Sequence, residues 1–234
     1  MKALLLDLDD TLLDYSGGVE GCWQAACAEA ADGVPQAALL AALIESRRWF
    51  WSDPARHRVE RVNMPRAWTR IAADALDRCG ADPGRAAAIA EAFAARRRAV
   101  MVLFPDALDF LGTLRARGLP LGLVTNGDAR EQRFKIERHD LARYFDAIVI
   151  EGELGTGKPD AVAYRTALAA LGVAPGPEVS MVGDHLEFDV AGAQRIGLRG
   201  VWLDRGGAGI PAGHPVRPDR IVRVLRDVLD GEAR

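Results

Sequence analysis

The sequence has few cysteines and no hydrophobic run long enough to cross a bilayer. Cys22, Cys27 and Cys79 form no CxxC pair and are too few for a disulfide framework, so we interpret them as reduced thiols packed as small apolar residues. The apolar run at residues 3–6 is shorter than the hydrophobic region of a signal peptide. We therefore expect a cytoplasmic protein that does not bind membranes.

Basic charge is spread thinly along the chain. The formal net charge is −3 and no run of like charge is present, whereas nucleic-acid binding needs a concentrated basic face. We therefore expect no nucleic-acid partner. Almost every basic residue is arginine, so the few lysines are conspicuous: Lys2, Lys135 and Lys158. The apolar fraction of 49% is ordinary for a globular protein with a buried core.

Residues 15–102 have apolar residues at helical spacing and no strand pattern. The predicted breaks are turn sequences at residues 32–33, 52–54 and 82–84. Helices are predicted at Val19–Ala31, Gln36–Phe50, Arg66–Arg78 and Arg85–Val100.

The rest of the chain alternates between short apolar runs and amphipathic segments. Strands are predicted at Ala3–Leu8, Leu119–Thr125, Ala147–Ile150, Val179–Val182 and Gly200–Leu203. Helices are predicted at Asp106–Arg117, Ala129–His139, Ala161–Leu171, Glu187–Ile196 and Ile221–Leu229. This alternation indicates an α/β fold with a doubly wound parallel sheet. We expect residues 1–14 and 103–234 to form this core, and residues 15–102 to be an inserted all-helical domain.

Two carboxylates follow the first predicted strand. Asp7 and Asp9 lie two residues apart, and side chains at that spacing face the same way in an extended segment. Two anions so close repel each other, so the site needs a cation or a raised pKa on one carboxyl. One carboxylate can then attack phosphorus, while the other protonates the leaving oxygen and later activates water.

Three further segments place polar residues at the carboxyl ends of predicted strands, where open parallel sheets bind ligands. Thr125 and Asn126 offer a hydroxyl and backbone N–H groups at a helix start, which suit a phosphoryl group. Lys158 opens another helix, where its ammonium would neutralise phosphate oxygens. Asp184 follows a strand and Asp189 lies five residues later, and Mg²⁺ prefers such oxygen ligands.

Together these segments read Asp-x-Asp-x-Thr, Thr-Asn, Lys-Pro and Gly-Asp-x-x-x-x-Asp, in that order. The set resembles the haloacid dehalogenase (HAD) superfamily over the whole predicted core. The resemblance implies a Rossmann-like core, a type 1 helical cap at residues 15–102 that closes over the site, and a Mg²⁺-dependent phosphatase acting on a small phosphomonoester.

The resemblance also implies a role for each motif residue. Asp7 is then the nucleophile, and Asp9 is the general acid and base, with its backbone carbonyl on Mg²⁺. Asp7 and Asp184 ligate the metal with their side chains, and Asp189 holds a ligand or a water from behind. Thr125 and the Asn126 backbone grip the phosphoryl group.

Lys158 stabilises that phosphoryl group in the same scheme.

Within the superfamily, haloacid dehalogenases lack the second aspartate, so the presence of Asp9 disfavours dehalogenation. Phosphonate-cleaving members need a cap lysine, and residues 15–102 contain none. Two alternatives stay open at this point: a phosphotransferase or mutase, and a non-catalytic binding protein on the same fold. Sugar phosphates, nucleotides and small organic phosphates are all candidate substrates.

Three features have two interpretations each. His185 either approaches the outer shell of the metal and titrates near neutral pH, or is bonded locally at a helix start. In the predicted cap, Trp49, Trp51, His57 and Arg58 either contact the substrate or serve the helical domain, whose core the tryptophans would form. The apolar faces of the cap leave both a monomer and a homodimer open.

Overall fold

A computed structural model describes residues 1–31 and 33–230, and its internal contacts divide the chain into two units. The first unit joins Met1–Asp14 to the chain from Val102 onward, and the second is Tyr15–Met101. Asp32, at one predicted break, and residues 231–234 of the predicted core lie outside the described residues. Within the two described ranges, no helix combines the length and the apolar character needed to cross a membrane.

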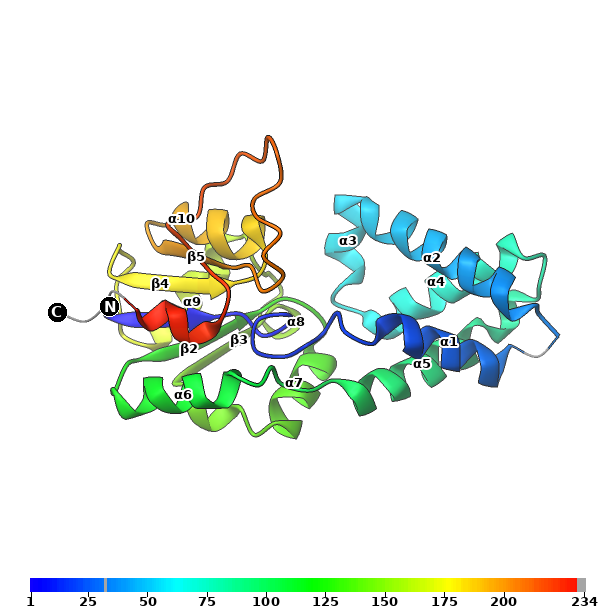
Figure 1. The fold of residues 1–234 in the computed structure, drawn as a ribbon, viewed down its shortest axis with the longest axis horizontal. Helices are drawn as coiled ribbons and strands as arrows, with labels where there is room; N and C mark the ends of the chain where they lie inside the picture. Colours follow the sequence, from blue (N-terminus) through cyan, green and yellow to red (C-terminus); the bar gives the residue numbers. More distant parts are fainter. Residues whose placement is uncertain (32, 231–234) are drawn as a thin grey trace. The chain divides into compact units, whose positions relative to one another are not determined.

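In the described part of the first unit, six strands form one parallel sheet in the order β3-β2-β1-β4-β5-β6 (Figure 1). The strands are β1 Ala3–Leu6, β2 Leu121–Thr125, β3 Ala147–Ile150, β4 Val179–Gly183, β5 Arg199–Leu203 and β6 Arg220–Val222. This arrangement confirms the predicted doubly wound α/β fold. β1 lies between β2 and β4, so the end of β1 falls in the middle of the sheet edge.

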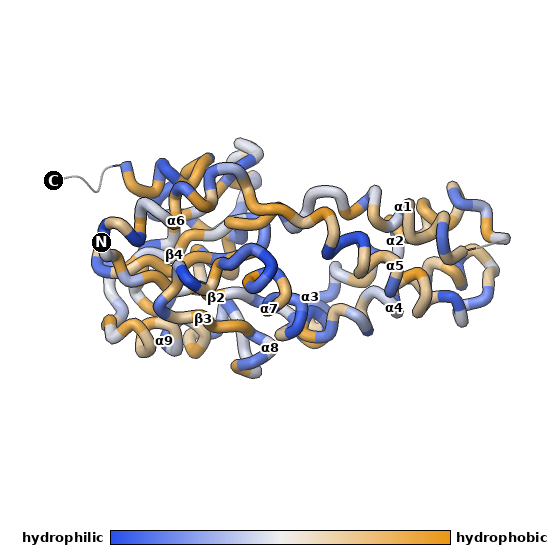
Figure 2. The backbone as a smooth tube through the Cα atoms, turned by 90° about the horizontal axis from the view of Figure 1, so that it is seen from below, coloured by the Kyte–Doolittle hydropathy of each residue, from blue (hydrophilic) through white to orange (hydrophobic). Residues whose placement is uncertain are grey.

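The central strand is apolar throughout because both faces of the sheet are covered. All four residues of β1 are buried, and Leu5 lies in register with Gly122 of β2 and Met181 of β4. Alternate residues of the strands pack against α9 (Ala161–Ala170) and α10 (Gly192–Gln194) on one face. Figure 1 shows α6 (Ala107–Ala116) and α7 (Ala129–Arg138) on the other side, and Figure 2 shows the hydrophobic colouring along β2 and β3.

The helices of the first unit follow the strands closely. They are α6 Ala107–Ala116, α7 Ala129–Arg138, α8 Glu151–Leu154, α9, the π-helical turn η3 Leu186–Ala191, and α10; 3₁₀ turns are η2 Ala142–Tyr144 and η4 Leu225–Leu229. α7 begins after Asp128, whose side chain accepts hydrogen bonds from the N–H groups of Arg130 and Glu131 at 2.9 and 3.1 Å. This cap fixes the direction in which α7 leaves the end of β2.

Two predicted helices were wrong in form. Residues 221–229 are not one helix: β6 pairs with β5, and only the turn η4 follows. The Asp106 side chain accepts a hydrogen bond from the backbone N–H of Leu225 at 2.8 Å, and this contact fixes the start of that turn. The predicted helix at residues 187–196 is instead η3 followed by the short helix α10, because the chain widens to a π-helical turn beside β4 and β5.

The second unit is helical in its described residues. Its helices are α1 Val19–Ala30, α2 Gln36–Ser52, α3 Pro54–Glu60, α4 Met64–Arg78 and α5 Ala86–Val100, with a 3₁₀ turn η1 Pro83–Arg85. Its core combines small, aliphatic and aromatic side chains, with Trp23 stacked on Phe93 at 3.8 Å between ring centroids. The helix α3 was not predicted as a separate element; it is short and starts at Pro54 with Asp53 as its cap.

Candidate active site

The polar residues predicted to carry chemistry lie where neighbouring strands end. Asp7 directly follows β1, Thr125 ends β2, and Asp184 directly follows β4. These three strands are adjacent in the parallel sheet, so their carboxyl ends meet at one edge. The fold therefore brings together residues that are far apart in the sequence.

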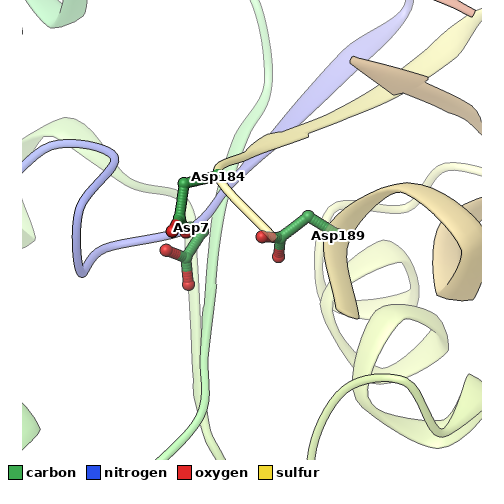
Figure 3. A group of neighbouring side chains, drawn as sticks. All are labelled: Asp7, Asp184 and Asp189. Atoms are coloured by element: carbon green, nitrogen blue, oxygen red, sulfur yellow. The ribbon is translucent and has the colours of Figure 1, made fainter. Parts of the chain in front are cut away.

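Three aspartates form a compact group at this edge. Asp7, Asp184 and Asp189 each offer a carboxylate oxygen, and these oxygens lie within 4.8 Å of one another. Figure 3 shows the carboxylates of Asp7 and Asp184 facing each other, with Asp189 reaching toward them from its helical turn. Such a set of oxygen donors is the kind that Mg²⁺ prefers.

A buried ammonium lies inside this group. The Lys158 Nζ donates to Oδ1 of Asp7 and to Oδ1 of Asp189, both at 2.6 Å, and the lysine is only 2% exposed. The other oxygen of Asp7, Oδ2, accepts from the Thr11 hydroxyl at 3.1 Å. These contacts fix the orientation of the Asp7 carboxylate, and Thr11 is a member of the site that the predictions had not assigned.

The electrostatics show too little positive charge for so many carboxylates. Burial above all, with the charges of Asp189 and Asp9, raises the pKa of Asp7 to about 7 despite the lowering effect of Lys158. Burial, together with the charge of Asp7, raises the pKa of Asp184 to about 8. Burial alone would lower the pKa of Lys158, but Asp189 and Asp7 outweigh it, so the amine stays protonated.

The Asn126 side chain holds the backbone on which Lys158 sits. Its Nδ2 donates to the Lys158 carbonyl at 2.8 Å, and its Oδ1 accepts from the Lys158 N–H at 2.7 Å. A Cβ at Gly157 would lie 2.5 Å from that Oδ1, so only glycine fits there. Asn126 therefore joins the loop after β2 to the lysine segment, which adds a side-chain function to the backbone function predicted for it.

Asp189 joins Lys158 to the backbone of His185 through hydrogen bonds. Its Oδ1 accepts from Lys158, and its Oδ2 accepts from the backbone N–H of His185 at 2.9 Å. A Cβ at Gly183 would lie 2.2 Å from the Asp189 Cγ, which explains the glycine at the end of β4. Asp189 is only 1% exposed, whereas Asp7 is 7% exposed and Asp184 is partly exposed, so Asp7 and Asp184 are more accessible to a cation.

Asp9 has a different set of partners. Both of its carboxylate oxygens lie 2.8 Å from the Nζ of Lys135, and Oδ2 also accepts from the Gln132 Nε2 at 2.9 Å. Asp7 and Asp9 were predicted to face the same way, and in the structure each carboxylate is paired with its own ammonium, that of Lys158 for Asp7 and that of Lys135 for Asp9. Lys135 is conspicuous in the sequence only as one of three lysines, and no motif of the sequence points to Gln132.

His185 makes the local contacts of the second interpretation. Its Nδ1 accepts from the N–H groups of Glu187 and Phe188 at 3.2 Å each, and its ring stacks on Phe188 at 3.9 Å between centroids. The imidazole thus caps the turn η3, which contains Asp189. It serves the site by fixing the start of that turn.

The remaining predicted residues belong to the helical unit. Trp51 is partly buried against the core of that unit, and its ring meets the ring of His57 edge-on at 5.4 Å. Trp49 is 47% exposed and carries the Arg56 guanidinium over its ring at 4.1 Å. Arg58 is exposed. The prediction of tryptophans in the helical core is thus right for Trp51 and wrong for Trp49, because Trp49 lies on the solvent side of α2.

The aspartate group fits a divalent metal. Three carboxylates share one ammonium, and the pKa values of Asp7 and Asp184 are raised by like charge as well as by burial. An added cation would relieve that repulsion and allow both carboxyls to ionise. The arrangement can therefore hold Mg²⁺ and present a carboxylate for attack beside a fixed positive charge.

Comparison with known proteins agrees with this geometry. Residues 1–197 match the family model of haloacid dehalogenase-like hydrolases. The chain is 39% identical to the phosphoserine phosphatase of Thermus thermophilus in an alignment of 257 positions that covers all of both proteins. It is 33% identical to the glyceraldehyde 3-phosphate phosphatase of Methanopyrus kandleri, over 88% of this chain and 85% of that protein.

A solved structure, a 2-haloacid dehalogenase from Pseudomonas syringae, superposes with a TM-score of 0.66 at 30% identity. The match covers 97% of this chain and 96% of the dehalogenase. The family match and the two phosphatase relatives agree with the four motifs at the sheet edge. The chain therefore belongs to the haloacid dehalogenase-like hydrolase family, which confirms the family predicted from those motifs.

Proposed function

We propose that this hydrolase is a Mg²⁺-dependent phosphatase that cleaves a small phosphomonoester through an aspartyl-phosphate on Asp7. One observation carries the proposal: the buried Lys158 ammonium lies 2.6 Å from an oxygen of Asp7, next to two further carboxylates. An ammonium fixed beside a nucleophilic carboxylate binds the equatorial oxygens of an incoming phosphoryl group and stabilises the charge of the transition state.

The reaction then has two steps. Asp7 attacks phosphorus, and Asp9 gives a proton to the leaving oxygen, so that an alcohol departs and a phosphoryl group stays on Asp7. Asp9 next removes a proton from water, which attacks phosphorus and frees Asp7 and inorganic phosphate. Thr125 and the Asn126 backbone bind the phosphoryl oxygens together with Lys158.

The metal belongs at the same edge. Asp7, Asp184 and the backbone carbonyl of Asp9 would hold Mg²⁺, with Asp189 behind them. When bound, the ion neutralises phosphate charge and keeps the carboxylates ionised. The raised pKa values of Asp7 and Asp184 support this assignment, because a cation would offset both the burial of these carboxyls and their mutual repulsion.

Phosphoserine is the first substrate to test, because the relative that is 39% identical over its whole length is a phosphoserine phosphatase. Glyceraldehyde 3-phosphate is the second, from the name of the other relative. The helical unit, residues 15–102, would act as the cap that selects among such substrates. Trp49 and Arg58 are its exposed candidates for substrate contact.

The test is phosphate release from a panel of phosphomonoesters, with and without Mg²⁺. The panel contains phosphoserine, glyceraldehyde 3-phosphate, a sugar phosphate, a nucleotide and p-nitrophenyl phosphate, with 2-haloacids alongside. Mg²⁺-dependent phosphate release that is lost in Asp7→Asn and kept in Asp109→Asn, an exposed aspartate of the same unit, supports the proposal. Halide release without phosphate release, or an isomerised product without free phosphate, contradicts it.

A further inference from the structure

Lys135 and Gln132 lie side by side on the buried face of α7. Lys135 is 3% exposed and Gln132 is 2% exposed, although α7 is mostly polar. They are three residues apart, a spacing that places both on the same side of a helix. The Lys135 ammonium donates to the Gln132 Oε1 at 2.6 Å, so the two side chains form one unit.

Lys135 and Gln132 together contact both carboxylate oxygens of Asp9. The Lys135 Nζ contacts Oδ1 and Oδ2 at 2.8 Å, and the Gln132 Nε2 contacts Oδ2 at 2.9 Å. A carboxylate held at both oxygens by a buried group cannot rotate freely about its terminal bond. The Asp9 side chain keeps 23% of its surface exposed, so it is held on one side and open on the other.

The same pair is tied to the phosphate-binding loop. The Gln132 Nε2 also lies 2.6 Å from the Thr125 hydroxyl oxygen and 3.0 Å from the Asn126 carbonyl. The position of Asp9 is thereby fixed relative to the loop proposed to bind the phosphoryl group. Burying an ammonium is costly unless it is paired, so the contact of Lys135 with Asp9 is a fixed part of the fold.

We propose that Lys135 is a positioning residue that orients the Asp9 carboxyl toward the leaving-group oxygen. Gln132 fixes the position of that carboxyl relative to the phosphate loop. The inference rests on the proposed function, because it takes Asp9 as the general acid. Lys135 itself acts only through Asp9. Proton transfer requires the carboxyl within hydrogen-bonding distance of the leaving oxygen, so a loss of aim lowers the rate where a proton is needed.

Leaving groups that differ in their need for a proton test this role. An alkyl phosphate releases a strongly basic alkoxide, whereas p-nitrophenyl phosphate releases a stable anion. In Lys135→Met we expect kcat/KM to fall by about 10-fold more for phosphoserine than for p-nitrophenyl phosphate, within the range that general acid catalysis supplies. Lys2→Met makes the same substitution at an exposed lysine, and we expect it to leave both values unchanged.

A cycle with Asp9→Asn separates the inference from the proposed function. Asp9→Asn alone should show the same preference for the good leaving group, and Lys135→Met added to it should change the ratio no further. An Asp9→Asn enzyme without that preference overturns the acid role of Asp9. A preference in Asp9→Asn but not in Lys135→Met overturns the inference alone, because a merely structural lysine would slow both substrates alike.

Folding is controlled in the same experiment. Thermal unfolding of each variant shows whether the loss of the buried ammonium has disrupted the unit. If Lys135→Met does not fold, Lys135→Gln takes its place, since its shorter amide lacks the ammonium that spans both oxygens of Asp9 but is still a polar partner for Gln132. The same leaving-group preference in Lys135→Gln supports the role, and an unchanged ratio in that folded variant overturns it.

Discussion

Asp7 and Asp9 lie two residues apart, yet their carboxylates belong to clusters of different charge. The cluster of Asp7 contains Asp184, Asp189 and one ammonium, from Lys158. The Asp9 carboxylate instead faces the ammonium of Lys135 and the amide of Gln132. The first cluster has three carboxylates to one ammonium, which suits a metal and a phosphoryl group, whereas the contacts of the second hold a single carboxylate in a fixed orientation.

The largest effect on catalysis is expected when the Asp7 cluster loses the Lys158 ammonium that contacts Asp7 and Asp189. We expect Lys158→Met to lower kcat/KM by about 10³-fold, because a fixed charge beside the nucleophile stabilises the transition state. Steady-state kinetics on the best panel substrate measures this, with Lys2→Met as the matched control. A loss of less than about 10-fold would show that this charge is not used in catalysis.

The second prediction concerns the stability of the metal-free protein as pH rises. The carboxyls of Asp7 and Asp184 have pKa values raised from 3.8 to about 7 and about 8, so the folded state holds their protons more tightly than the unfolded chain does. This contribution is complete below pH ~4 and is lost as pH rises through 7 and 8. We expect the free energy of unfolding to fall between pH 5 and 9.

Urea unfolding in EDTA at several pH values measures this slope, and Mg²⁺ should flatten it by binding the ionised carboxylates. A metal-free protein that becomes more stable between pH 5 and 9 would contradict the proposed shortage of positive charge.

The smallest effects should have opposite signs in the two clusters. Asp184→Asn removes one of three repelling carboxylates, so we expect it to stabilise the metal-free protein at pH 8 by about 1 kcal/mol. Asp9→Asn removes a carboxylate that pairs with a buried ammonium, so we expect a destabilisation of about 2 kcal/mol. Urea unfolding in EDTA compares the two, and shifts of the same sign would contradict the distinction between the clusters.

Sequence reasoning succeeded for helices and strands with a local periodicity, and for site residues that belong to the motifs of one family. The run at residues 3–6 identified β1, and helices such as α9 followed from their spacing. Asp7 and Lys158 are 151 residues apart, and only the resemblance of the motifs placed them in one site. The structure adds their contact and its geometry.

The errors share a physical cause, which is dependence on distant neighbours. β6 is three residues long and is a strand because it pairs with β5, which a local pattern does not show. Lys135 lies on a polar helix 126 residues from Asp9, so nothing in its neighbourhood reveals the ion pair. Its rarity among so many arginines was the available signal.

The most direct test of the central claim is to trap the phosphoryl group on the enzyme. Asp9→Asn turning over p-nitrophenyl phosphate with Mg²⁺ should accumulate phosphoenzyme, because the first step needs little acid while the second lacks its base. After an acid quench, mass spectrometry should find the phosphoryl group on the peptide that contains Asp7, and none in the Asp7→Asn, Asp9→Asn double variant. A phosphoryl group on another residue, or equal labelling of the double variant, would contradict nucleophilic attack by Asp7.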